Sequence, residues 1–240
     1  IRRQRQMCIR DRRIDAANAR TARRALASGR LTIGSAALFT AGAAACFIAA
    51  CAAFGVLNAN WWPLILSVPV LGWIALYSFT KRFTALCHVF LGSALAISPI
   101  AAAIAVDPGA LGRTPALGFL AGMVLFWVSG FDVIYALQDV AFDRATGLFS
   151  VPSRLGVARA IWLSRAMHAV AFGLLVGAWA VEPRFGAMFG AAVVAVAGLL
   201  IAEHAILAKR GEDGLDMAFF TLNGIVSCVL GAAGVLDLLN

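Results

Sequence analysis

The sequence predicts an all-α protein, a polytopic bundle of transmembrane helices. Of its 240 residues, 62% are hydrophobic and only 13% are charged, and the mean hydropathy is +0.87. Soluble domains have roughly 45–50% apolar and about 25% charged residues. The apolar residues gather into seven long runs, and the basic residues collect in alternate loops between the runs. The expected environment of the chain is therefore a lipid bilayer.

Each of the seven runs has about the length that a helix needs to cross the hydrocarbon core, which is roughly 20 residues. The runs are rich in Ala, Gly and Leu and show no strict alternation, which favours helices over the strands of a barrel. Trp61 and Trp62 stand at the edge of a run, as interfacial anchors do. The runs cover approximately residues 32–56, 61–79, 84–106, 115–138, 157–181, 185–208 and 216–238.

The basic residues predict how the helices are oriented. Eighteen of the twenty lie in the first segment and in every second loop after it, whereas Arg113 and Arg184 lie in the intervening loops. Short loops rich in Lys and Arg stay in the cytoplasm. The net charge of +8 is thus explained by topology, and no nucleic-acid partner is expected. We expect a multi-pass protein of a bacterial-type inner membrane, with Lys81 on the cytoplasmic side.

The most informative stretch runs from Asp132 to Gly156, where the fourth run ends. Asp132, Asp139 and Asp143 are seven and four residues apart, so a continuous helix would place them on one face, together with Tyr135. Carboxylates aligned in so apolar a chain are costly unless something neutralises them. A divalent cation such as Mg²⁺ is the obvious candidate, because it takes one or two carboxylates together with phosphate oxygens. The alternative is that the acids are simply solvated where the helix leaves the membrane.

This stretch resembles the second Asp-rich motif of the UbiA family of intramembrane prenyltransferases, D-x-x-Y-x-x-x-D-x-x-x-D-x-x-x-G-x-x-S-x-x-x-R-x-G. Its YALQD segment is most similar to the 4-hydroxybenzoate polyprenyltransferase branch, which includes relatives that prenylate a dihydroxynaphthoate. The residues that match the motif are Asp132, Tyr135, Asp139, Asp143, Gly147, Ser150, Arg154 and Gly156.

The segment before the first apolar run resembles the first Asp-rich motif of the same family, N-x-x-x-D-R-x-x-D-x-x-N-x-R-T-x-x-R. Met7 stands where that pattern begins with Asn. The alternative is a basic cytoplasmic tail that contains two incidental acids. The matching residues are Asp11, Arg12, Asp15, Asn18, Arg20, Thr21 and Arg24.

The resemblance implies a fold of nine transmembrane helices, in which the first motif closes the second helix. Here the first motif precedes every apolar run. We therefore expect residues 1–240 to form a single UbiA-like domain that lacks the first two helices, with residues 1–10 not being native family sequence. The alternative is a divergent protein with seven helices.

The resemblance also implies a reaction: the Mg²⁺-dependent transfer of a polyprenyl group from a polyprenyl diphosphate to an aromatic acid of the 4-hydroxybenzoate type, in ubiquinone or menaquinone biosynthesis. Tyr135 would stabilise the allylic cation, and Asp139 or Asp143 could orient or deprotonate the acceptor. The metal would be held by Asp11, Asp15, Asp132, Asp139 and Asp143. The diphosphate would be bound by Lys81, Arg20, Arg154 and Asn18.

Other functions are compatible with parts of the sequence. The acceptor could be a dihydroxynaphthoate, a porphyrin or a glycerol-based lipid, or the chain could be inactive as it stands. A proton- or cation-coupled transporter also needs acids in the membrane, but such acids tend to lie near the bilayer midplane rather than at helix ends. We expect no obligatory protein partner. His88, His168 and His204 are expected to be packed or interfacial side chains, isolated from one another.

Overall fold

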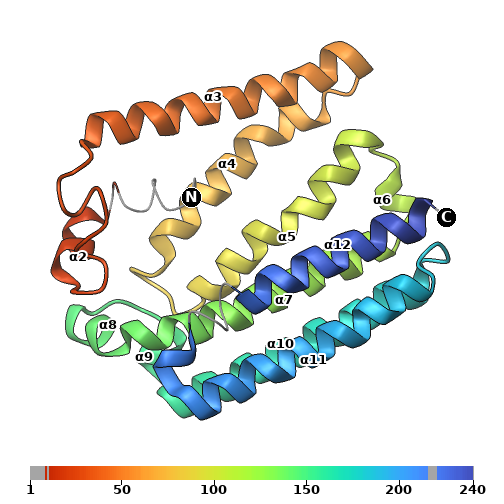
Figure 1. Cartoon of the computed structure of the whole chain (residues 1–240). Coiled ribbons are helices and arrows are strands. Elements are labelled where there is room, and N and C mark those ends of the chain that lie inside the picture. Colours follow the sequence, from red (N-terminus) through yellow and green to blue (C-terminus); the bar gives the residue numbers. More distant parts are fainter. Residues whose placement is uncertain (1–8, 10, 216–220, 240) are drawn as a thin grey trace. The chain divides into compact units, whose positions relative to one another are not determined.

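The computed structural model describes residues 9, 11–215 and 221–239, and every regular element among them is a helix. The chain divides into two compact units, residues 1–79 and 80–240. Figure 1 shows the helices along the chain. Residues 1–8 and 10, which the sequence suggested are not native family sequence, lie outside the described residues.

The first unit contains a short helix, α2 (Arg12–Ala17), and two long ones, α3 (Ile33–Asn58) and α4 (Trp62–Thr80). The side chain of Thr32 caps α3 by accepting a hydrogen bond of 3.1 Å from the Ser35 N–H. The chain then reverses through Ala59, whose φ of 55° is left-handed. The ring of Trp61 lies so close to Gly55 that a Cβ there would overlap it. A tight turn therefore joins the two apolar helices.

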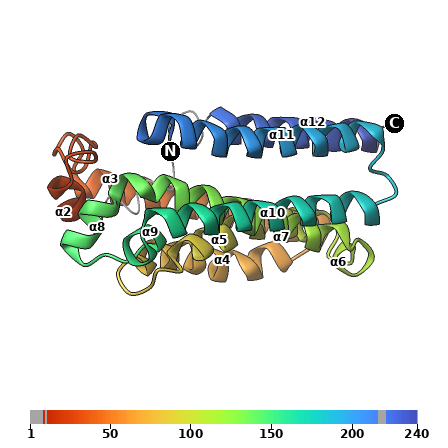
Figure 2. The ribbon, with the colours of Figure 1, turned by 90° about the horizontal axis from the view of Figure 1, so that it is seen from below.

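The second unit is a bundle in which α7 packs against α5 and α10, and α11 packs against α10 and α12. In Figure 2, α11 and α12 form a pair that runs beside α7 and α10. The apolar core lies between these helices and includes Met123, Leu175 and Val196. The bundle helices are α5 (Cys87–Val106), α7 (Ala116–Tyr135), α10 (Val157–Val181), α11 (Ala187–Arg210) and α12 (Asn223–Leu239).

The predicted spans agree closely with the long helices. Six helices are long and apolar enough to cross a membrane, and the seventh predicted run corresponds to the shorter apolar helix α12. The all-helical prediction is therefore confirmed. The short elements at the helix ends were not predicted; they are α6 (Ala110–Arg113), η1 (Ala136–Asp139), α8 (Val140–Thr146), α9 (Val151–Leu155) and η2 (Gly211–Gly214).

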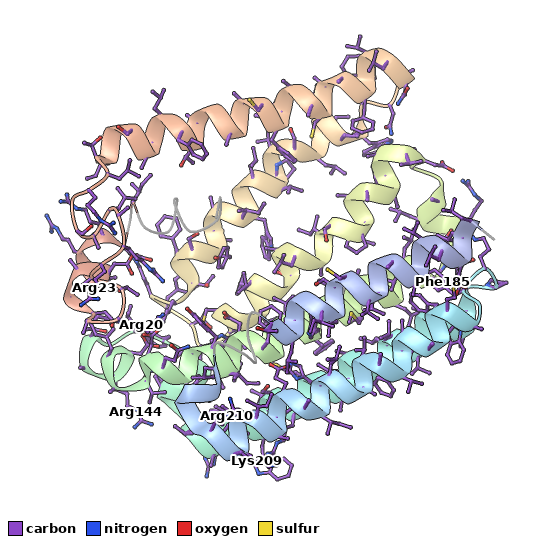
Figure 3. All side chains as sticks on the ribbon, viewed as in Figure 1. Arg20, Arg23, Arg144, Phe185, Lys209 and Arg210 are labelled. Carbon is purple, nitrogen blue, oxygen red and sulfur yellow. The ribbon has the colours of Figure 1, made fainter. Side chains whose placement is uncertain are left out.

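The charges of the second unit gather at one end of its bundle. Figure 3 shows Arg144, Lys209 and Arg210 at that end and Phe185 at the other. By chain connectivity, eight of the ten basic residues in this unit lie at the end where α5 begins and α7 finishes. The distribution of charge predicted from the sequence is thus present within this unit.

Small residues let α5 and α7 approach closely. A Cβ on Gly92 of α5 would overlap the backbone carbonyl oxygen of Leu125 and the hydroxyl of Ser129. The Ser129 hydroxyl in turn lies 2.7 Å from the Leu125 carbonyl oxygen and 3.2 Å from the His88 carbonyl oxygen, so its single proton is shared between these two acceptors. Membrane helices associate through such close backbone packing, because lipid offers no hydrophobic drive between them.

The first prediction tests this contact. Gly92→Ala should destabilise the protein by about 1–3 kcal/mol, because the new methyl group meets a backbone atom that cannot move aside. Thermal unfolding in detergent or nanodiscs measures the effect. The control is Gly173→Ala, at a position in α10 with nothing within 4 Å of the added Cβ. Equal unfolding temperatures for the two variants would contradict the close approach.

Candidate active site

Asp143 is the centre of the polar cluster at the charged end of the second unit. It is completely buried; its Oδ1 atom is ion-paired and its Oδ2 atom is hydrogen-bonded. Lys81 Nζ lies 2.9 Å from Oδ1, and the Ser150 hydroxyl donates a hydrogen bond of 2.9 Å to Oδ2. Removing a carboxylate from water costs several kcal/mol unless it is paired and hydrogen-bonded. Lys81 and Ser150 together meet that requirement.

Two segments far apart in the sequence meet around this carboxylate. The Phe149 N–H donates to the Lys81 carbonyl at 2.7 Å, and the Cys87 thiol lies 3.5 Å from the Phe149 carbonyl. Ser150 also caps α9, because its hydroxyl accepts from the Ser153 N–H at 3.3 Å. We call the paired segments 80–88 and 143–151 the clasp. The 80–84 and 139–156 loops therefore lie at the same end, as the charge pattern predicted.

Asp132 forms a separate pair with His88 of α5. The Asp132 Oδ2 atom lies 2.6 Å from His88 Nδ1, and His88 Nε2 lies 3.2 Å from the Val151 N–H. The side chain of His88 is only 3% exposed, whereas that of Asp132 is 23% exposed. The sequence predicted a packed His88 that is isolated from the other histidines, and the buried ring agrees with this, but the pairing with Asp132 was not predicted. No local signal could reveal the pair, because its two members are 44 residues apart.

The three carboxylates do not share one continuous helical face. Regular α-helix ends at Tyr135, and Ala136–Asp139 form a 3₁₀ turn. Each 3₁₀ residue advances about 120° instead of about 100°, so four of them rotate Asp139 by roughly 80° from its expected direction. The prediction of one continuous α-helix from Asp132 to Asp143 is therefore wrong, and Asp139 is turned from its expected direction. Asp139 is buried and stands one turn before Asp143, at the start of α8.

Other predicted residues of the second motif lie close by in the chain. The guanidinium of Arg154 lies over the Phe149 ring, 3.9 Å from its centroid. Tyr135 is the last residue of α7. Gln138 has a buried Nε2 atom with no hydrogen-bond partner among the described residues.

The first motif has its own local structure in the first unit. Arg24 Nη1 lies 3.0 Å from Asp15 Oδ1, and the Thr21 hydroxyl donates a hydrogen bond of 2.9 Å to the Asp15 carbonyl. Asn18 Oδ1 accepts a hydrogen bond of 3.0 Å from the Arg20 N–H, so the Asn18 side chain shapes the turn after α2. Asp11 is the N-cap of α2. Because the two motifs belong to different units, the binding of one metal by acids of both motifs stays a prediction.

The carboxylates differ in their capacity to hold a metal. No three His, Cys, Asp or Glu side chains converge on one point among the described residues. Asp143 has both oxygens engaged, whereas Asp15 Oδ2 is buried without a hydrogen-bond partner in the described part of the chain. Mg²⁺ is usually held by one or two carboxylates plus substrate phosphates rather than by a complete protein cage. The donors present fit a metal of that kind.

A second polar cluster lies within the bundle, where the sequence predicted isolated histidines. His168 Nδ1 of α10 lies 3.0 Å from His204 Nε2 of α11, and 3.9 Å from a carboxylate oxygen of Glu203. The prediction that these two histidines are isolated is therefore wrong. Trp127 and Asn223 add a hydrogen bond of 2.8 Å between α7 and α12. These contacts join neighbouring helices through polar groups.

A bundle of apolar helices with buried carboxylates and cations at one end defines a membrane-embedded site for an anionic substrate. The model of the UbiA prenyltransferase family matches residues 8–225, and the chain belongs to this family. It is an intramembrane prenyltransferase, and membership implies the use of a divalent metal ion.

The relatives have consistent names. The chain is 34% identical to the 4-hydroxybenzoate octaprenyltransferase of Nitrosomonas europaea, over 95% of the chain and 75% of the relative. It is 30% identical to the enzyme of the same name from Aromatoleum aromaticum, over 95% and 74%. The mitochondrial 4-hydroxybenzoate polyprenyltransferase of Aedes aegypti is 28% identical over 69% of the chain and 36% of the relative. The resemblance to this branch is confirmed.

Two solved structures share the fold. A UbiA homologue from Aeropyrum pernix superposes with a TM-score of 0.86, at 30% identity, over 99% of this chain and 84% of that one. A digeranylgeranylglyceryl phosphate synthase superposes with a TM-score of 0.66, at 19% identity, over 100% and 81%. The second likeness concerns the fold alone.

The second prediction tests the clasp. Ser150→Ala removes the donor to Asp143 and the cap of α9, so it should cost about 1.5–3 kcal/mol of stability. Thermal unfolding measures the loss. Ser98→Ala is the control, since that exposed hydroxyl bonds only within its own helix at 2.7 Å, and should change stability by less than about 0.5 kcal/mol. An unchanged unfolding temperature for Ser150→Ala would show that the burial of Asp143 does not depend on this hydroxyl.

Proposed function

We propose that the chain transfers a polyprenyl group from a polyprenyl diphosphate to an aromatic acid of the 4-hydroxybenzoate type, in ubiquinone or menaquinone biosynthesis. The likeness to the Nitrosomonas europaea octaprenyltransferase carries this proposal, because it extends over 95% of the chain. The contact between Lys81 and Asp143 supports it, since it places a cation beside the second Asp-rich motif.

The cationic side chains would bind the diphosphate. Lys81 is 36% exposed although Asp143 holds it, so its ammonium group remains accessible to a second anion. An ammonium acts as a point charge, whereas Arg154 has the planar fork that suits bidentate phosphate contact. Arg20 and Asn18 shape the turn of the first motif in the other unit. They too are proposed to bind the diphosphate.

Mg²⁺ is the proposed metal, and when bound it supplies Lewis-acid stabilisation of the leaving diphosphate. Asp139 and Asp15 are the first candidates to hold it, because Asp15 has a free buried oxygen and Asp139 stands one turn before Asp143. The remaining proposed ligands are Asp11, Asp132 and Asp143.

The transfer breaks the allylic C–O bond, with the electron pair leaving on the diphosphate. A ring carbon of the acceptor forms the new C–C bond, and its proton must then be removed. Tyr135 is proposed to stabilise the allylic cation through its ring face. Asp139 or Asp143 would orient the acceptor or accept this proton.

We further propose that the charged end of the second unit faces the cytoplasm of a bacterial-type inner membrane, following the excess of basic residues there. The bilayer and the two substrates are the proposed partners. A thiol-reactive, membrane-impermeant probe tests the orientation on a protein that carries a single new cysteine in the 147–149 loop. Labelling of inside-out but not right-side-out vesicles is the expected result.

The acceptor is tested directly. The whole protein in nanodiscs receives Mg²⁺, a polyprenyl diphosphate and either 4-hydroxybenzoate or dihydroxynaphthoate. We expect a prenylated product from 4-hydroxybenzoate. Product from dihydroxynaphthoate alone would identify dihydroxynaphthoate as the acceptor in place of 4-hydroxybenzoate. Absence of product from both acids would overturn the proposal of an aromatic-acid acceptor.

The third prediction concerns the second motif. Asp139→Asn and Asp143→Asn each keep the side-chain shape but remove a charge, so turnover should fall at least about a hundredfold, roughly 2.7 kcal/mol of barrier. The apparent Mg²⁺ affinity should also fall. The control is Asp107→Asn at the opposite end of α5, where Asp107 pairs with Arg113 and should tolerate the change. Normal, Mg²⁺-independent turnover by Asp139→Asn would contradict the metal-binding role and favour the alternative that the acids are simply solvated at a helix end.

A further inference from the structure

His88 connects three elements of the candidate site. It lies in the first turn of α5, its Nδ1 atom lies 2.6 Å from Asp132 on α7, and its Nε2 atom lies 3.2 Å from the backbone N–H of Val151 in α9. Its side chain is 3% exposed. A ring held at both nitrogens in so buried a place has a single orientation.

The two contacts determine where the proton of the ring lies. The Val151 N–H can only donate, so His88 Nε2 must accept with its lone pair and carry no proton. A neutral imidazole then carries its proton on Nδ1, which donates to the Asp132 carboxylate. A doubly protonated ring would set two donors against each other at Val151.

The hydrogen bond leaves half of the Asp132 carboxylate available. Oδ2 is taken by His88, whereas Oδ1 makes no hydrogen bond to any described residue, and the side chain is 23% exposed. The ring therefore fixes the plane of the carboxylate while one oxygen stays open to the surroundings. His88 also holds Val151, which is next to the Ser150 that holds Asp143.

We propose that His88 is a positioning residue of the prenyl-transfer site: its ring, held at both nitrogens, orients Asp132 and locks it to the Ser150–Val151 turn. This inference rests on the proposed function, in which Asp132 is one of the acids that serve the diphosphate. Hydrogen bonds that orient metal-binding carboxylates typically change metal affinity or activity by 10- to 100-fold. His88 acts through Asp132 and touches no substrate.

A substitution series separates the two roles of the ring. His88→Gln supplies both an amide donor for Asp132 and a carbonyl acceptor for Val151, so turnover should stay within about threefold of the parent protein. His88→Leu has neither group and should lower turnover and apparent Mg²⁺ affinity about tenfold. His88→Glu keeps only an acceptor and sets a second carboxylate against Asp132, so it should not restore activity.

Two measurements do not depend on activity. Nitrogen-15 solid-state spectra of the histidine-labelled protein in bilayers, compared with His88→Gln, should show His88 with a protonated Nδ1 and an unprotonated Nε2. The rise in unfolding temperature caused by Mg²⁺ with inorganic diphosphate should be smaller for His88→Leu than for His88→Gln.

Trp179→Phe is the control for a general loss of stability. It removes indole bonds of 3.1 and 3.2 Å to two backbone carbonyls at the opposite end of the bundle, and should leave turnover and Mg²⁺ affinity unchanged. A protonated Nε2, or equal losses in the Leu and Gln variants, would overturn the proposal. If the parent protein forms no prenylated product, the proposed function fails, while the spectra and the stability shifts still decide the role of His88.

Discussion

The ion pair between Asp143 and Lys81 is the interaction on which the functional end of the second unit depends. A carboxylate with no exposure to water must be neutralised and hydrogen-bonded, and only residues from outside its own helix do this. Lys81 comes from the segment before α5 and Ser150 from the turn before α9. Satisfying one buried charge therefore brings two distant segments together, and the backbone contact of Phe149 with the Lys81 carbonyl follows from that closure.

The 3₁₀ turn after Tyr135 has a consequence for the electrostatics of the site. A regular helix would have stacked the carboxylates of Asp132, Asp139 and Asp143 along one face, where like charges repel. The tighter turn changes the direction of Asp139 relative to Asp132, and each end of the series has its own partner, His88 or Lys81. Asp132 and Asp143 therefore have separate partners in the described part of the protein, although they lie close together in the chain.

The parts of the structure that the sequence predicted are those that depend on local composition. The span at residues 157–181 corresponds to α10, Val157–Val181, because length, hydropathy and flanking charge decide where a helix crosses the bilayer. The motif residues were found because their spacing is a local pattern. The contacts of His88 with Asp132 and of His168 with His204 join residues 44 and 36 positions apart, so only the packing of α5 on α7 and of α10 on α11 reveals them. The 3₁₀ turn escaped prediction because ALQD continues the apolar pattern of the helix before it.

The charges around the clasp also explain why a cation from outside the chain is needed for the proposed reaction. Asp132, Asp139 and Asp143 bring three carboxylates to this end of the second unit. Of the eight basic side chains there, Lys81 is already paired with Asp143, and Arg144 is bonded to the Ser153 carbonyl at 3.1 Å. Neither cation is therefore available to the diphosphate alone, which carries several negative charges of its own. A divalent ion held by one or two of these carboxylates would supply positive charge where the two anionic groups approach each other.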